Sequence, residues 1–468
     1  MPSHYGLPLT IDMHERSRMQ ESARRRRLLD GVWEADLVET MSQYVAPEQM
    51  AAWGRPDLTK NVFRSVVSQL SILYDREPII EHADDPVAAE RMRELCRGAG
   101  VWTQGPQLQR LVIGQREALR RVSWEDGALL VRLVPVDTVE ASSSPNTPST
   151  AHTVIEYRHR ELDGQELLTR DVLSVAGGVG VYRIESGDGK RDLTSMFLGA
   201  DYSGEAYPYR RGDGSPVLPY VMTHALDTGR LFDTYEGREL VEGSLKVAVL
   251  WSFWSHIVFD CSHPQRYGVN ARPAGLAADA RNDEHATFIA TDPASLLLME
   301  ASNPDAPVTL GQFAPGGDPV AVGTAIRDYA SDLAMDFDLS PGDIQRSHGD
   351  ARSGYAIHVV NEGKRRAQLK YQPQFARADV ELLEVIAALH NTYSGEAPLP
   401  ETGYSVRYQG LPLSVDERRT RIEEYRTRSE LGIASPVQLL AELEGITDDQ
   451  ARARLAQIRR DRVEFGTI

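Results

Sequence analysis

The chain is organised around residues 318–352, which read DPVAVGTAIRDYASDLAMDFDLSPGDIQRSHGDAR. From residue 319 to residue 337, apolar residues recur every three or four positions, as on one face of an amphipathic helix, and Asp318 stands where it caps a proline at the first helical position. Residues 339–352 break this pattern with two glycines, a proline, both charge signs and almost no apolar residue. The stretch therefore predicts a helix followed by a mobile loop.

Long helices are predicted on both sides of this stretch. Downstream, helical character resumes at Ser353 and continues well past Pro373, which lacks a backbone donor and predicts a kink. Upstream, residues 238–260 are apolar around nearly the whole circumference of a helix, which predicts burial on all sides, in the core or between subunits. Between these helices, residues 265–317 hold strand-like runs and end in proline- and glycine-rich turns. The order is helix, small strand-containing excursion, helix, exposed loop, long kinked helix.

In the region from residue 101 to residue 232, the helical spacing of apolar residues gives way to short β-branched or aromatic runs divided by turn residues, which is typical of strands. The predicted strands are residues 128–134, 153–157, 179–184 and 216–221. A buried helix is predicted ahead of them at residues 61–74. The glycines of residues 177–180 predict a bulge and not a nucleotide loop, because no helix with a Lys-Ser/Thr pair follows. The polar residues 142–150 predict an exposed loop.

Both ends of the chain carry charged helical patterns. Residues 1–55 predict an N-terminal arm, in which the basic run Arg24–Arg27 lies between helical segments and is interpreted as a solvated or partner-facing face. Near the other end, a short strand is predicted around Val406 and Tyr408. Three capping-box signatures, beginning at Ser414, Ser435 and Thr447, then predict three helices. The junction at residues 431–436 has the form of a helix-turn-helix elbow, but its surroundings are not basic, which favours a small helical cap.

Composition limits the classes of function. The chain has 468 residues and a formal net charge of -17, which argues against a protein that wraps duplex DNA through a basic surface. Its two cysteines, Cys96 and Cys261, have no metal-site spacing and predict free thiols in a reducing compartment. The most apolar run, residues 247–259, is too short to span a bilayer, so no membrane association is expected. Motifs of phosphate loops, zinc proteases and serine hydrolases do not occur.

From about residue 60 to its end, the chain resembles the portal proteins of tailed bacteriophages. The resemblance rests on the succession of elements described above, together with the Ser353-Gly-Tyr-Ala-Ile357 sequence after the loop, Lys364-Arg-Arg366 in the long helix, and Leu431-Gly-Ile-Ala-Ser435 in the tail. One departure is the turn at residues 74–78, where the family often has a glycine.

The resemblance implies an α+β portal fold with wing, stem, clip and crown, assembled as a ring, usually a dodecamer, with a central channel. The implied divisions are an N-terminal arm (1–55), wing (56–236), first stem helix (237–262), clip (263–317), second stem helix (318–338), tunnel loop (339–352), long kinked wing helix with its return strand (353–413) and helical crown (414–468). The implied function is to form the ring at one capsid vertex through which double-stranded DNA is packaged and ejected.

The resemblance also implies partners and site residues. The partners are other copies of the chain, double-stranded DNA held without sequence specificity, the terminase packaging motor, the major capsid and scaffolding proteins, and a head-tail adaptor. The implied location is the virion, after assembly in the host cytoplasm, and no catalytic residue, cofactor or metal is expected. Arg346, His348 and Arg352 are candidates for transient phosphate contacts in the tunnel loop, with Asp343 and Asp350 limiting their grip. The stem residues expected at the subunit interface are Trp251, Phe253, Trp254 and Tyr329.

Two other classes of function stay open on the sequence alone. One is a regulatory DNA-binding protein that uses the C-terminal elbow. The other is an enzyme with its site in the β-rich region, where a deep polar pocket would be expected.

Overall fold

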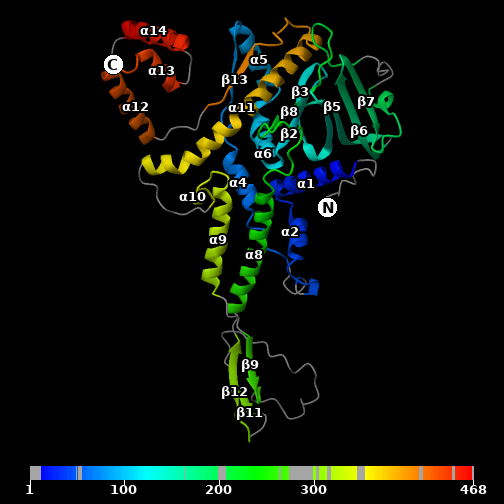
Figure 1. Cartoon of the computed structure of the whole chain (residues 1–468), viewed down its shortest axis with the longest axis vertical. Coiled ribbons are helices and arrows are strands. Elements are labelled where there is room, and N and C mark those ends of the chain that lie inside the picture. Colours follow the sequence, from blue (N-terminus) through cyan, green and yellow to red (C-terminus); the bar gives the residue numbers. More distant parts are fainter. Residues whose placement is uncertain are drawn as a thin grey trace. The chain divides into compact units, whose positions relative to one another are not determined.

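A computed structural model describes the chain at residues 12–48, 50, 55–162, 164–198, 207–262, 265–273, 299–301, 305–313, 318–344, 354–409, 415–444 and 448–465. It mixes helices and sheets, as the α+β prediction required (Figure 1). The chain divides into two compact units. The first comprises Met1–Arg26, Ser65–Glu236 and Ala334–Ile468, and the second comprises Arg27–Arg64 and Gly237–Leu333.

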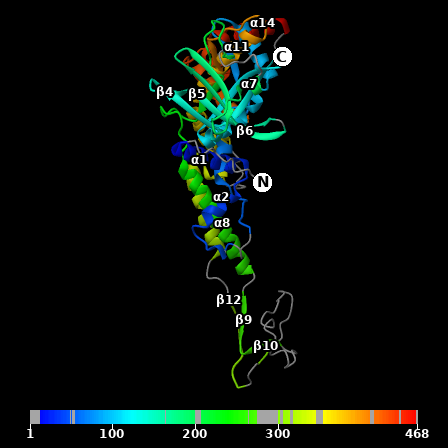
Figure 2. The same ribbon diagram turned by 90° about the vertical axis from the view of Figure 1, so that its right-hand side faces the viewer.

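The first unit contains two antiparallel sheets. In the smaller one, β2 (Glu117–Glu125) lies between β3 (Ala128–Pro135) and β8 (Tyr220–His224). The larger one runs in chain order through β4 (Val139–Ser144), β5 (Thr147–Leu162), β6 (Gln165–Ala176) and β7 (Val179–Ser186), which Figure 2 shows as long neighbouring ribbons. A two-stranded ladder pairs β1 (Ile79–His82) with β13 (Tyr404–Arg407), so the strand expected near Val406 is present.

Several helices of the first unit lie between its strands in the sequence. They are α5 (Pro86–Gly98), α6 (Gly105–Gln115), the short α7 (Thr194–Leu198), α10 (Pro341–Ile344) and the 40-residue α11 (Gly354–Tyr393), with single 3-10 turns at Trp102–Gln104 and Val136–Thr138. Of these helices, α5, α6, α7 and α11 contact the sheets. The second half of α11 contacts β2 and β8 and buries an apolar stripe that includes Leu382, Leu383 and Ile386. This stripe gives the unit a core in which one long helix covers a sheet.

Several sequence predictions in the β-rich region need correction. Three strands, β2, β4 and β6, were not predicted. Residues 142–150 are mostly exposed, as expected, but they belong largely to the β4–β5 hairpin and not to a loop. Gly177 and Gly178 have positive φ values of 59° and 78° and form the turn between β6 and β7, so they are hairpin residues and not a bulge. Gly180 packs so closely on Tyr207 that an added Cβ would lie 2.4 Å from the ring.

The N-terminal basic run is also different from the prediction, because it lies inside one continuous helix, α1 (Met13–Asp30). Arg25 is 1% exposed and donates to the carbonyl oxygen of Glu236 at 2.9 Å, and Arg26 pairs with Asp137 at 3.0 Å. Further along the helix, in the second unit, Arg27 pairs with Asp36 at 2.7 Å. These three arginines hold the fold together and do not form a solvated face.

The second unit is built on two long helices, α8 (Arg238–Ser262) and α9 (Pro319–Met335), with the shorter α2 (Glu34–Met41). The helix α4 (Val62–Leu70) begins in this unit and ends in the first, four residues before the predicted end of that helix. Between α8 and α9, β9 (Gln265–Val269) pairs with β12 (Thr309–Phe313), and β10 (Ala271–Pro273) pairs with β11 (Met299–Ala301). The chain therefore leaves one long helix, forms paired strands and returns in a second long helix, as predicted.

The helix ends follow the capping chemistry of the sequence. The Asp318 carboxylate accepts a hydrogen bond from the Val320 amide at 2.9 Å, which confirms it as the cap of α9. This helix ends two residues earlier than predicted, because Asp338 adopts a φ of 62° and the Leu339 amide donates back to Ala334.

The three predicted C-terminal helices are present as α12 (Val415–Glu430), α13 (Pro436–Glu444) and α14 (Asp448–Phe465). Gly432, with a φ of 65°, closes α12, and the Ile433 amide donates to the Arg428 carbonyl. Ser435 and Gln438 then exchange side-chain hydrogen bonds with each other's amides at 3.2 and 3.0 Å, which confirms that capping box.

Candidate functional site: the α8–α9 helix pair

The α8–α9 pair is the candidate site for subunit contact, and its two helices run antiparallel at close approach. At one end Gly243 faces Leu333, where an added Cβ would lie 2.6 Å from a side-chain methyl. At the other end Gly323 faces Trp254, where an added Cβ would lie 2.9 Å from the indole nitrogen, and the Trp254 indole N–H donates to the Pro319 carbonyl at 2.7 Å. Glycines at both crossings let the backbones approach, so the pair is a tightly packed element.

The aromatic residues predicted for the interface lie together on this pair. The rings of Trp251 and Trp254 stack with centroids 4.6 Å apart and an interplanar angle of 26°. Lys60 lies 4.9 Å from the centre of the Trp251 ring, and Lys246 lies 5.5 Å from that of Tyr329. All three aromatic side chains, like that of Phe253, are half-buried within the single chain.

Burial changes along α8. Its first half is buried within the chain, including Leu240, Leu245 and Val249, whereas the side chains from Phe253 to Val258 are only half-buried and Phe259 is 62% exposed. Val320, at the adjoining end of α9, is 73% exposed. Burial in the core of a single chain therefore fails for the second half of α8, and burial between subunits stays a prediction there. A contiguous set of apolar side chains at one end of the pair keeps surface that another molecule can cover.

The loop after α9 begins differently from the prediction. Asp343 lies in the short helix α10 with its side chain 2% exposed, accepts hydrogen bonds from the amide and hydroxyl of Ser340 at 2.9 and 2.8 Å, and pairs with Lys364 of α11 at 3.2 Å. Its carboxylate fixes the start of the loop to α11 and is not available to face a channel. Arg346, His348, Asp350 and Arg352 lie outside the described residues. Pro373 lies within α11, which continues through it, and the kink expected there stays a prediction.

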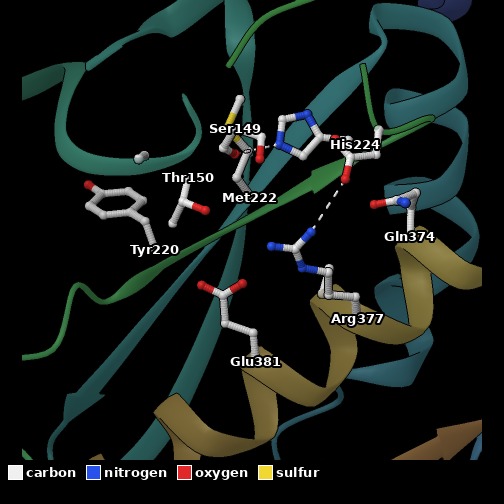
Figure 3. Close-up of a pocket in the computed structure, with 11 residues that line it drawn as sticks. Ser149, Thr150, Tyr220, Met222, His224, Gln374, Arg377 and Glu381 are labelled. Atoms are coloured by element: carbon white, nitrogen blue, oxygen red, sulfur yellow. Dashed lines mark hydrogen bonds and ion pairs between the residues drawn. The ribbon is translucent and has the colours of Figure 1, made fainter. Parts of the chain in front are cut away.

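The β-rich region has one small polar cavity, shown in Figure 3, that bears on the enzyme hypothesis. Burial raises the pKa of Glu381 and lowers the pKa of His224, whose Nε2 lies 3.1 Å from the Ser149 carbonyl. Arg377, between them in the view, pairs with Asp227 at 3.6 Å. Opposite shifts of an acid and a base are typical of catalytic sites. The cavity measures about 30 Å³, however, which is space for about one water molecule, so it is not the deep pocket that hypothesis required.

Two clusters of buried charges in the first unit were not predicted. Arg120 pairs with Asp379 at 2.6 Å, while Arg121 pairs with Asp171 at 2.8 Å and with Glu156 at 3.2 Å. Adjacent arginines in a strand point to opposite faces, which is how β2 serves both clusters. The only signal in the sequence was the Arg-Arg pair itself, because its acidic partners lie far away along the chain.

Among the residues that the structure describes, no group of three or more His, Cys, Asp or Glu side chains is arranged to hold a metal ion. Within the same residues, no helix has the length and apolar character needed to cross a membrane.

Comparison with known proteins gives only distant structural likenesses. No protein-family model matches the chain, and no curated protein matches it. Among solved structures, a chain from the neck of an empty gene transfer agent particle computed with C6 symmetry is 11% identical, with a TM-score of 0.45 over 82% of this chain and 90% of that one. A chain from the virion of a native gene transfer agent particle is 12% identical, with a TM-score of 0.43 over 88% and 99%. A chain from the neck of a native particle computed with C12 symmetry is 14% identical, with a TM-score of 0.42 over 82% and 89%. Similarity at this level assigns no function.

Proposed function

We propose that this chain is a portal subunit: many copies form a ring at one vertex of a viral capsid, and double-stranded DNA enters and leaves through its centre. The observation that carries the proposal is the α8–α9 pair, whose apolar side chains remain partly uncovered where the two helices lead into the paired strands. A ring supplies each copy with two neighbours, which can cover those side chains from both sides. In this assignment, the helix pair is the stem, and the strands between the helices form the clip that meets the packaging motor and later the head-tail adaptor.

The charge of the chain supports the same assignment. A channel must guide a polyanion without holding it, and contact through many basic groups would make adhesion strong. With a net charge of -17 per copy, the ring repels DNA on average. Arg346, His348 and Arg352 remain the proposed sites of brief phosphate contact in the tunnel loop. Of the two acidic residues expected to limit that contact, Asp350 keeps this proposed role, whereas the Asp343 carboxylate is engaged by Ser340 and Lys364.

The assembly test uses Phe259, because its side chain is 62% exposed and a charge there costs the single chain little. Wild-type protein is expected to form particles of many chains with a central opening by native mass measurement and negative-stain microscopy. Phe259→Glu should reduce these to monomers with an unchanged circular dichroism spectrum, while the control Phe259→Leu should still assemble. Solid particles without an opening, or rings formed normally by Phe259→Glu, would contradict the proposal.

The channel test addresses the loop. Replacing Arg346 and Arg352 with glutamate should leave ring formation intact and impair DNA packaging or retention, since phosphate contacts become repulsive. Unchanged packaging by intact rings of this variant would count against the loop's proposed contact with DNA.

A further inference from the structure

A cavity of about 490 Å³ in the first unit is lined by none of the residues proposed for the ring contacts. It is an open groove whose walls are α5, the β2–β3 hairpin and the chain that follows α11. We call it the α5 groove. Its volume is within the range of sites that hold a side chain or a small ligand.

Small residues keep the α5 groove open. Gly98 and Ala99 line it from the end of α5, and Gly127 and Ala128 line it from the hairpin. A Cβ added at Gly98 or at Gly127 would meet no atom within 4 Å. The space is therefore not filled by the chain itself.

The floor of the α5 groove is apolar, with two polar atoms left unused. Trp124, Leu129 and Leu399 provide the apolar surface. The Trp124 ring stands edge-on to the His390 ring, with centroids 6.0 Å apart. Neither the Trp124 indole N–H nor Nδ1 of His390, a residue only 3% exposed, has a hydrogen-bond partner among the described residues. A buried polar atom without a partner destabilises a structure, and a bound partner is one way to satisfy it. The Trp124 N–H needs an acceptor, such as a backbone carbonyl oxygen of a bound segment.

The rim of the α5 groove is acidic. Glu94 is exposed, and the Glu396 side chain is 73% exposed, 3.4 Å from His390. The single basic residue of the lining, Arg91, already donates to the carbonyl oxygens of Ala397 and Pro398. Arg91 keeps its positive charge in these bonds, but Glu94 and Glu396 outnumber it, so the field at the opening is negative on balance.

We propose that the α5 groove binds a lysine or arginine side chain of a partner protein, presented on a segment that also has apolar residues. The aliphatic stem of that side chain lies on Trp124 and Leu129, and its cationic head lies between Glu94 and Glu396. Nucleic acid and anionic membrane surfaces are excluded as occupants by the sign of the rim. The inference does not depend on ring formation, because the groove lies within the first unit of a single chain.

The test measures fluorescence anisotropy of a labelled peptide of alternating lysine and leucine, and of its counterpart with glutamate in place of lysine. Gly98→Phe fills the groove without adding charge, and Gly98 has an ordinary backbone conformation that accepts a side chain. The pair Glu94→Lys and Glu396→Lys reverses the rim. The control Glu161→Lys changes the net charge at an exposed strand position outside the groove.

Wild-type protein should bind the lysine peptide and not the glutamate peptide. Gly98→Phe and the double rim variant should each weaken binding by about tenfold, as expected for the loss of one anchored cation with its apolar contacts, and Glu161→Lys by less than about twofold. Circular dichroism of Gly98→Phe should match that of the wild type. Equal binding by Gly98→Phe and wild type, equal binding of both peptides, or no binding of the lysine peptide would each overturn the proposal.

Discussion

Replacing Asp379 with alanine should destabilise the first unit more than any surface change. The carboxylate is fully buried on α11, pairs with Arg120 of β2 at 2.6 Å, and accepts from the hydroxyls of Tyr74 and Tyr408 at 2.9 and 2.5 Å. It therefore links the long helix to the sheet and to two tyrosines from separate parts of the chain. Arg120 is itself only 3% exposed.

The magnitude follows from what Asp379→Ala leaves behind. Removing one partner of a buried ion pair leaves the other charge without compensation, which costs about 3–5 kcal/mol. The Tyr74 and Tyr408 hydroxyls lose an acceptor in addition, although they lie 3.3 Å apart and can bond to each other. The double replacement Arg120→Met with Asp379→Leu also removes the uncompensated guanidinium. It should therefore recover at least half of the stability lost in Asp379→Ala.

Urea denaturation followed by tryptophan fluorescence provides the measurement. Trp102 stacks on Tyr74 with centroids 6.3 Å apart, so its emission reports on this cluster. Protein concentration must be held fixed across variants, because self-association adds to apparent stability. A loss below about 1 kcal/mol for Asp379→Ala, or a double variant no more stable than the single one, would show that the ion pair is not what holds α11 to the sheet.

Three further predictions concern other buried or closely packed positions. Burial raises the pKa of Glu117 to about 8. The contribution of Glu117 to the free energy of unfolding is therefore fully present below pH 4.5 and is lost as the pH rises to 8. Relative to Glu117→Gln, the wild type should lose up to about 1.4 kcal/mol per pH unit between these limits in urea titrations, and parallel pH profiles would contradict this. Gly363→Ala would place a Cβ 2.0 Å from the Asp338 carbonyl oxygen, so it should lower the thermal midpoint clearly, whereas Gly98→Ala should not. Ser435→Ala should cost α13 about 1 kcal/mol, seen as faster amide exchange in that helix alone; uniform exchange throughout the chain would refute the capping role.

The long helices were predictable from sequence because their signals are local. Apolar composition located α8, apolar periodicity located α9 and the helical character after Ser353 located α11, while capping side chains such as Asp318 and Ser435 marked where helices begin. Each of these signals lies within a few residues of the feature that it predicts. For this reason the helices before and after the paired strands were found with errors of only a few residues.

The strand β2 was missed because its signal is not local. The sequence of β2 is polar, because it contains Glu117, Arg120 and Arg121, yet all three side chains are buried. The two arginines can be buried because Asp379, Glu156 and Asp171 meet them in the folded chain. No pattern within β2 shows where these partners are. The partial exposure of the second half of α8 could not be predicted for a similar reason. The sequence shows which side chains are apolar, but not which neighbour covers them.

The difference between local sequence signals and contacts in the folded chain also affects how the charge of the chain is interpreted. From the sequence alone, the basic run Arg24–Arg27 is interpreted as a solvated or partner-facing face of a helix. In the structure, the arginines that are buried are matched by a slightly larger number of buried acidic side chains, among them Asp137, Asp171 and Asp379. The buried side chains therefore carry nearly equal numbers of positive and negative charges. Most of the net charge of -17 belongs to side chains outside the buried set. Under the proposed function this excess of acidic side chains would favour passage of DNA over capture of DNA, which is the physical difference between a channel wall and a regulator that reads a groove.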